Sequence, residues 1–180
     1  MAPRLVRPDL AYMPSFVAAL REGYARDTLR PETPESIAEV AGDQAAFVAS
    51  QLAPPTSVTL PDGSQGPAVP YTVLWYVEGA EFLGSLHIRH HLNANLEKVG
   101  GHVGYAVRPS ARGLGHASAI LAAGLDYIRA NLDLERVLLT VNAQNPASIR
   151  VIEKNGGVHT ASIPHIWIPG DTALHYWIEL

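Results

Sequence analysis

Hydrophobic residues in the first third of the chain recur every three or four positions, which is typical of helices. This spacing predicts a helix over residues 14–25 and a second helical region over residues 33–52. Thr33 is suited to cap the second region, and Pro34 fits its first turn. A short apolar segment over residues 4–7 predicts a strand before both helices.

The pattern changes after a segment rich in proline and glycine over residues 53–70. This segment predicts a long loop, with a Pro-Asp-Gly turn at residues 61–63. Three runs of β-branched, aromatic and other apolar residues follow, and the link between the second and third has room for a helical turn. The strands predicted from these runs cover residues 71–77, 81–90 and 102–107.

The last part of the chain alternates between helical and strand periods. The predicted elements are a long helix, a strand, a short helix and a terminal hairpin, over residues 115–131, 135–142, 146–155, 162–168 and 173–180. The order predicts a mixed α/β fold, in which one mixed, twisted sheet of six to seven strands is flanked by helices in a single domain over residues 1–180. We expect the strand–helix–strand unit in its middle to form a parallel crossover.

The segment VRPSARGLGHA, between the third of these strands and the long helix, carries the clearest chemical signal. Gly113 and Gly115 leave backbone N–H groups uncovered where the helix begins, and the helix dipole points its positive end at the same place. Such a helix start binds phosphate groups, and Arg108 and Arg112 add positive charge beside it. The alternative interpretation is a tight loop without a ligand.

Two common phosphate-binding motifs do not fit this loop. A P-loop requires a Gly-Lys pair, which the chain lacks. A dinucleotide fingerprint requires a third glycine where this chain has Ser118, and Asp126 comes too early to be its acidic residue.

Composition excludes several classes of function. The net charge of −4 argues against a general nucleic-acid binder, which needs a positive surface. The absence of cysteine excludes disulfide bonds, cysteine–zinc sites and thiol nucleophiles. The N-terminus does not resemble a signal peptide, and no apolar run is long enough to span a membrane. We therefore expect a cytoplasmic protein with no membrane or nucleic-acid partner.

The element order, VRPSARGLGHA and a second segment, QNPASIRVIEKNGG, together resemble the GNAT superfamily of acyl-CoA-dependent N-acetyltransferases, in particular a bacterial branch of predicted acetyltransferases. The cofactor loop of that superfamily, [Q/R]-x-x-G-x-[G/A], is matched by Arg112, Gly115 and Ala117. Its second signature, an Asn that opens a short helix closed by a Gly, is matched by Asn145 and Gly156. The resemblance implies the GNAT fold, acyltransferase activity and acetyl-CoA as cosubstrate.

The resemblance also implies where acetyl-CoA is held. Backbone groups at a splayed strand end would pair with the pantetheine amides, and the N–H groups of the glycine loop would hold the pyrophosphate. Asn145 would contact the pantetheine arm. The cofactor-binding residues implied in this way are Tyr105, Ala106, Val107, Arg112, Gly113, Leu114, Gly115, His116, Ala117 and Asn145.

Direct attack of an amine on a thioester requires a base, an oxyanion donor and a way to stabilise the departing thiolate. The candidate bases are His102, Glu97 and His87. His102 is our predicted catalytic residue, because imidazole exchanges protons near neutral pH. The alternative is that His102 fixes the turn formed by Gly100 and Gly101 through hydrogen bonds.

The residue at the position of the acid that protonates the leaving thiolate differs from the family pattern. Many GNAT members have a tyrosine seven residues after the helix-opening Asn, where this chain has Ile152. Tyr105 is the predicted catalytic substitute, and His175 and Tyr176 on the last strand are further options.

These residues predict an N-acetyltransferase that moves acetyl from acetyl-CoA to a primary amine of a small molecule or peptide. The alternatives are a GNAT-fold protein that binds acyl-CoA without turnover, or an acyltransferase with another acyl group or acceptor. A group of acidic residues either favours a cationic amine or forms a solvated helix face. Its members are Glu32, Glu35, Glu39 and Asp43.

Two further expectations concern metals and self-association. Four histidines cluster between residues 87 and 102, but Arg89 shares a strand face with His87 and His91 and would repel a cation, so we predict no metal site. The apolar terminal hairpin, with Trp167 and Trp177, is suited to pair two subunits in a homodimer.

Overall fold

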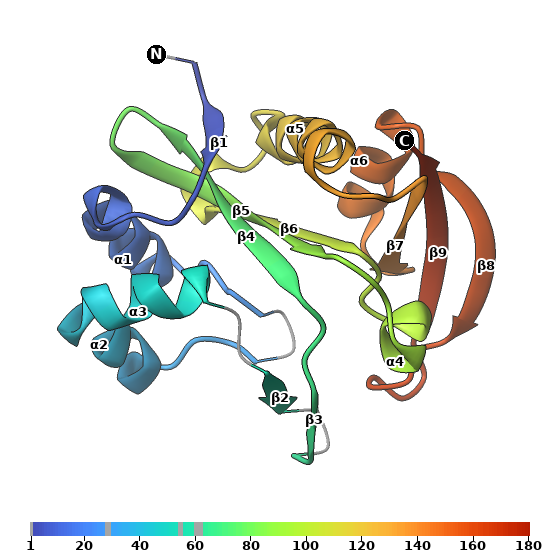
Figure 1. Ribbon diagram of the computed structural model, residues 1–180, viewed down its shortest axis with the longest axis horizontal. Helices are drawn as coiled ribbons and strands as arrows, with labels where there is room; N and C mark the ends of the chain where they lie inside the picture. Colours follow the sequence, from blue (N-terminus) through green and yellow to red (C-terminus); the bar gives the residue numbers. More distant parts are fainter. Residues whose placement is uncertain (1, 28–29, 54–55, 60–62) are drawn as a thin grey trace.

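The computed structural model describes residues 2–27, 30–53, 56–59 and 63–180. A four-stranded and a three-stranded antiparallel sheet lie next to each other (Figure 1). The first has the order β1-β4-β5-β6, with the strands Arg4–Val6, Tyr71–Glu78, Glu81–Arg89 and Val103–Val107. The second has the order β7-β9-β8, with the strands Arg136–Asn142, Thr172–Glu179 and Val158–Pro164.

Helices cover both faces of the four-stranded sheet (Figure 1). On one face lie α1, α2 and α3, which span Met13–Arg21, Pro34–Gly42 and Gln44–Leu52. On the other face lies α5, His116–Asn131, with α6, Pro146–Lys154, packed beside it. A short helix α4, Ala94–Lys98, connects β5 to β6, and two 3-10 turns span Leu10–Tyr12 and Pro109–Ala111.

Each face of the sheet buries its own core. Between the sheet and α1, the Phe16 ring packs 4.7 Å from Trp75 and 4.9 Å from Phe82, measured between ring centroids. On the other side, the apolar face of α5 packs against residues of both sheets, including Leu86 of β5 and Leu139 of β7. Burial of this face, which removes apolar surface from water, therefore holds the two sheets together.

The helices near the N-terminus are confirmed, with one division that the spacing did not reveal. Thr33 caps α2 as predicted, and its hydroxyl accepts a hydrogen bond from the Ser36 N–H. The helical region over residues 33–52 is split at Asp43, whose carboxylate accepts a hydrogen bond of 2.9 Å from the Ala46 N–H. This cap begins a new helix, so α2 and α3 are separate.

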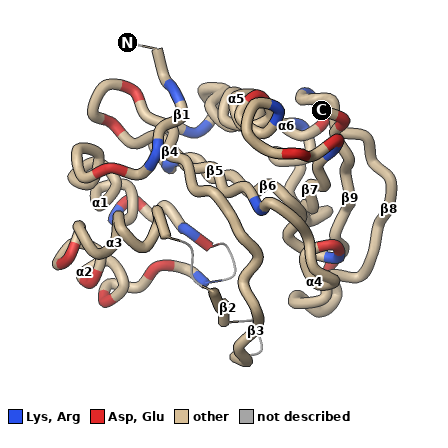
Figure 2. Tube along the Cα trace, in the orientation of Figure 1, with Lys and Arg blue, Asp and Glu red and all other residues tan. Residues whose placement is uncertain are grey.

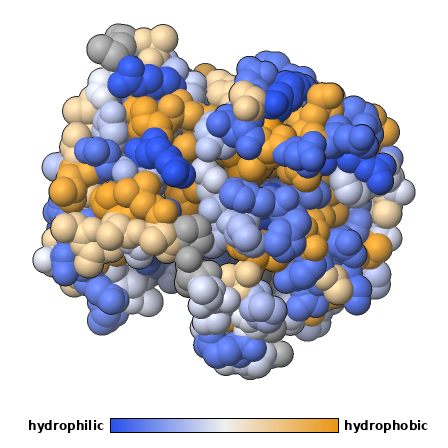
Figure 3. Space-filling model, in the orientation of Figure 1, coloured by the Kyte–Doolittle hydropathy of each residue, from blue (hydrophilic) through white to orange (hydrophobic). Residues whose placement is uncertain are grey.

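The prediction of an irregular loop over residues 53–70 is wrong in part. It contains a small hairpin of β2, Ser57–Thr59, and β3, Gln65–Pro67. Residues 61 and 62 of the predicted turn lie outside the described residues. The hairpin projects from the body of the protein (Figures 1 and 3), so it buries little apolar surface and gives only a weak pattern in the sequence.

Two predictions about the C-terminal half also need correction. The two larger sheets together hold seven strands, within the predicted six to seven, but they are separate sheets, and the β2–β3 hairpin adds two more strands. The expected parallel crossover is wrong, because every described ladder between named strands is antiparallel and none joins β6 to β7. The first strand of the terminal hairpin begins at Val158, because its pairing with β9 extends back to Trp177. Residues 165–168, which end in the apolar run Ile166, Trp167 and Ile168, follow that strand and form no part of it.

Two glycines allow α5 and β6 to lie close to β5. A Cβ at Gly84 of β5 would overlap the carbonyl oxygen of Ala106 and lie 2.9 Å from the Cδ1 of Ile120. A Cβ at Gly124 of α5 would lie 2.5 Å from the Cδ2 of Leu86, which is fully buried. These close approaches determine how near β6 and α5 lie to β5.

Gly84→Ala should therefore lower the free energy of unfolding by about 1–3 kcal/mol, because backbone atoms of β6 have to move. Gly42→Ala is the matched control, since a Cβ at Gly42 meets nothing within 4 Å and alanine favours a helix. Chemical denaturation of both variants provides the measurement. Equal stability of the two would contradict the close packing described for β5.

Candidate active site

One edge of β6 has no strand partner among the described residues. The other edge pairs with β5, with Leu86 opposite Tyr105 and Gly84 opposite Val107. β6 and β7 are joined just before β6 begins, where the His102 N–H donates to the Leu138 carbonyl at 2.7 Å. Past this point the two strands form no ladder, so backbone groups along β6 face a gap between the sheets.

The loop after β6 ends in an uncapped helix start. Gly113 and Gly115 have φ angles of 79° and 85°, in the left-handed region, and Gly115 is the N-cap of α5 without a side-chain hydrogen bond. Within the described part of the chain, no acceptor bonds to the backbone N–H groups of residues 113–117. A Cβ at either glycine would meet nothing within 4 Å, so the space in front of these N–H groups is open.

The two arginines of this loop have different roles. The Arg108 guanidinium pairs with the carboxylate of Glu22 and donates to the Ser15 hydroxyl, and the pair lowers the pKa of Glu22 to about 2. Arg108 therefore ties the loop to α1. The Arg112 Nε donates to the carbonyl oxygen of Val107 at 3.2 Å, and Arg112 is exposed. Its positive charge remains available beside the helix start.

A cavity of about 510 Å³ lies on the α1 side of β5 and β6. Its floor is one face of the two strands, formed by Ser85, His87 and Arg89 of β5 and by Gly104 and Ala106 of β6. Its walls come from segments far apart in the sequence. They include Ala25–Asp27, Arg30, Val58, Thr59, Pro67–Val69, Tyr71, Asn93, Asn95, Leu96, Val99, Gly100, Tyr105 and Trp167.

A model of the acetyltransferase (GNAT) domain matches residues 28–158, well over half of the chain. The chain belongs to this GNAT family. Membership makes it an acyltransferase with acetyl-CoA as cosubstrate, which confirms the fold and the enzyme class expected from the two sequence signatures. No curated protein matches the sequence.

Solved structures share the same fold. A mutant spermidine/spermine N-acetyltransferase SpeG from Vibrio cholerae is 15% identical, with a TM-score of 0.62 over 99% of this chain and 95% of that one. An acetyltransferase from Salmonella typhimurium that modifies the N-terminal serine of ribosomal protein L7/L12 is 14% identical, with a TM-score of 0.64 over 100% and 96%. Mycobacterium smegmatis RimJ, in complex with CoA-disulfide, is 20% identical, with a TM-score of 0.65 over 98% and 80%. At these identities the likeness shows the fold alone.

The GNAT second signature lies across the gap from β6. The Asn145 side chain caps α6 by accepting a hydrogen bond of 3.1 Å from the Ser148 N–H. The Tyr105 hydroxyl donates to the Ser148 carbonyl oxygen at 3.3 Å, and burial raises the pKa of Tyr105. The Tyr105 side chain therefore spans from β6 to the first turn of α6. Ile152 is buried in the core and offers no hydroxyl.

His102 is placed where the geometry favours the structural alternative. Its Nδ1 accepts a hydrogen bond of 2.9 Å from the Leu138 N–H, so the neutral ring carries its proton on Nε2. Burial, together with the positive charge of Arg89, lowers the pKa of His102 to about 4. The ring nitrogen that could accept a proton, Nδ1, is already hydrogen-bonded to the backbone of β7, beside the turn of Gly100 and Gly101. Glu97 is exposed in α4 and does not line the cavity.

His87, the third of the candidate bases, lies on the cavity floor. Its ring stacks on Tyr71, with centroids 6.4 Å apart and planes inclined by 20°. Burial and the charge of Arg89 lower the pKa of His87 to about 4, so the ring is neutral at neutral pH. Among the described residues its ring nitrogens have no hydrogen-bond partner, which leaves a lone pair available.

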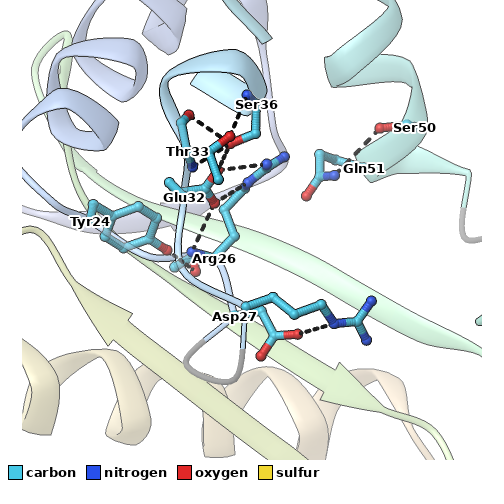
Figure 4. A network of polar contacts seen from close by, with 10 residues as sticks. Tyr24, Arg26, Asp27, Glu32, Thr33, Ser36, Ser50 and Gln51 are labelled. Atoms are coloured by element: carbon cyan, nitrogen blue, oxygen red, sulfur yellow. Dashed lines mark hydrogen bonds and ion pairs between the residues drawn. The ribbon is translucent and has the colours of Figure 1, made fainter. Parts of the chain in front are cut away.

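The acidic residues do not line the cavity as a group. Glu32 is held by Arg26, with Nε–Oε1 and Nη2–Oε2 distances of 2.6 and 2.8 Å, and it also accepts from Ser36 (Figure 4). The acidic residues along α2 and at its end (Figure 2) are Glu35, Glu39 and Asp43. All three are exposed, and none of them lines the cavity. They therefore form a solvated helix face.

Three other expectations can be compared with the described residues. No group of three or more His, Cys, Asp or Glu side chains suited to a metal ion occurs among them. None of the described helices is both long and apolar enough to cross a membrane. Trp167 lines the cavity, and the Trp177 ring packs against the Arg136 guanidinium, with 4.3 Å between Cζ and the ring centroid.

The buried His102 predicts a loss of stability in mild acid. Below about pH 6.5 the unfolded chain binds a proton that the folded ring rejects until about pH 4, so the free energy of unfolding decreases as the pH falls through this range. The contribution of His102 between about pH 7.5 and pH 5 is about 2 kcal/mol. Denaturation of wild type and His102→Asn at both pH values measures it. A decrease of the same size in both proteins would disprove this assignment.

Proposed function

We propose that this GNAT enzyme transfers the acetyl group of acetyl-CoA to a primary amine of a small molecule bound in the cavity, by direct attack on the thioester. The observation that carries the proposal is the position of β6. Its free edge faces the gap that leads to the open helix start, and the face of the same strand forms part of the cavity floor. One strand therefore contacts both substrates.

The cosubstrate would be held mainly by backbone groups. The unpaired N–H groups of residues 113–117 and the positive end of the α5 dipole suit the pyrophosphate, with Arg112 adding charge. The edge of Tyr105, Ala106 and Val107 suits the pantetheine amides, which would take the place of a missing strand. Asn145, already committed to capping α6, would contact the pantetheine arm through the atoms that the cap leaves open.

The amine would approach from the cavity. In the proposed reaction the neutral His87 ring takes a proton from the amine, and the amine nitrogen forms a bond to the thioester carbonyl carbon. The backbone N–H of Val107, on the free edge of β6, stabilises the oxyanion. The C–S bond then breaks, and the thiolate leaves with a proton from Tyr105 or from solvent. His102 acts as a positioning residue that keeps β6 and β7 joined at the closed end of the gap.

We also propose that residues 1–180 act as one domain. The support is the shared sheet, since β4 and β5 contribute side chains to both cores and α5 contacts both sheets. The acceptor-binding walls and the cosubstrate loop are therefore parts of one packed unit.

Gly115→Val should abolish measurable binding of CoA, because a β-branched side chain at a positive φ distorts the helix start and covers its N–H groups. Gly170→Val is the matched control, since Gly170 has a φ of 82° and equally open surroundings in the terminal hairpin. Isothermal titration calorimetry with CoA measures both variants. Wild-type affinity in Gly115→Val would overturn the proposed cosubstrate site.

His87→Gln should lower kcat by about 100-fold or more, because the amine loses its base. The affinity for CoA should not change, since His87 faces the cavity and not the glycine loop. His91→Gln, which alters an exposed histidine nearby, is the control. Release of CoA thiol from acetyl-CoA is followed with a panel of primary amines. If wild type binds CoA but releases no thiol with any amine, the protein is a binder without turnover.

A further inference from the structure

Arg89 is the charged group on the cavity floor that the proposed reaction does not use. Its Nη1 donates to the carbonyl oxygens of Gly100 and Gly101 at 3.1 and 3.0 Å. These glycines have φ angles of 118° and 60°, and a Cβ at Gly100 would lie 3.7 Å from Nη1. The turn therefore fixes the guanidinium in one orientation.

The opposite edge of this guanidinium is open. Among the described residues, Nε and Nη2 of Arg89 have no hydrogen-bond partner, and no fully buried side-chain nitrogen lacks one, so these two atoms face accessible space. Arg89 lines the cavity. In this protein Arg26 binds the carboxylate of Glu32, and Arg108 that of Glu22, through this same Nε–Nη2 edge. The open edge is thus a preorganised fork for a carboxylate or phosphate.

The other charges around the cavity are already compensated. Arg26 pairs with Glu32, and Arg30 pairs with Asp27 at 3.2 Å. Arg89 is the cavity-lining arginine without a carboxylate within 4.0 Å, within the part of the chain that the structure describes. The Asp27 carboxylate, which pairs with Arg30, acts on Arg89 through its charge but forms no ion pair with it. A partly buried charge without an ion pair is costly. An anion entering the cavity would supply the missing partner.

The CoA diphosphate is not that anion. Arg89 lies next to the pair of Ile88 and Val103, at the beginning of β6, whereas the glycine loop follows Val107 at its end. The distance along the strand is roughly 17 Å at about 3.4 Å per residue. The two anion sites therefore lie at opposite ends of β6.

We infer that the acceptor is a small primary amine that also carries a carboxylate or phosphate, and that Arg89 binds this anion while the amine lies at His87. The inference rests on the proposed function. The two side chains are two residues apart on one face of β5, about 7 Å along the strand. Several bonds therefore separate the amine from the anion. A polycation would place like charge against Arg89.

The test compares amines of the same length that differ in the group at the far end. These are 4-aminobutanoate, 3-aminopropylphosphonate, butylamine and putrescine, which end in a carboxylate, a phosphonate, a methyl group and an ammonium. Thiol release by wild type should give kcat/KM about 10- to 100-fold higher for at least one of the two anionic amines than for butylamine, with putrescine lowest. The first two amines distinguish a carboxylate from a phosphate-like anion.

Arg89→Gln should raise KM for the preferred anionic amine by a similar factor and leave butylamine unaffected. Arg89→Lys, which keeps the charge without the fork, should lie between them. Arg21→Gln removes the same charge from an exposed position of α1 and serves as the control. Transfer by wild type to butylamine or putrescine as fast as to the anionic amines would overturn the inference and leave the acetyltransferase proposal standing. Failure to bind CoA in calorimetry would instead reject the proposed function.

Discussion

The site depends on a single contact between two strands that otherwise stay apart. The His102 N–H bonds to the Leu138 carbonyl oxygen, and the Leu138 N–H bonds to the His102 ring. This reciprocal pair joins the sheets at the start of β6, and no ladder continues it. An unpaired strand edge favours the binding of an extended segment or ligand, because each of its backbone groups is a strong hydrogen-bond donor or acceptor. In the proposed function, that edge binds the pantetheine chain of the cosubstrate.

Close packing at two glycines fixes the position of this open edge relative to the start of α5. Gly84 lets β5 approach the backbone of Ala106, and Gly124 lets α5 lie directly on Leu86. Arg108 fastens the loop between β6 and α5 to Glu22 of the N-terminal part. These supports hold the N–H groups of residues 113–117, which have no acceptor among the described residues, in position before any ligand binds, and this lowers the entropy lost on binding.

The cavity on the other face of β5 and β6 has a different electrostatic character from the protein as a whole. The chain has a net charge of −4, yet the cavity floor holds a neutral His87 beside a charged Arg89. Arg89 helps to keep His87 neutral, since a positive charge nearby lowers the pKa of that imidazole further than burial alone. The protonation state of His87 therefore depends on the charge of Arg89, two residues away on the same strand.

The sequence by itself determined the features that depend on neighbouring residues. These include the caps at Thr33 and Asn145, the glycine loop at residues 113–117, the order of the elements and the family. Only the tertiary structure decided which histidine faces the cavity. His87 and His102 have similar surroundings in the sequence, but one lies on the cavity floor and the other is bonded to β7. The cavity itself is formed by segments between residues 25 and 167, and their meeting depends on sheet register and helix packing over the whole chain.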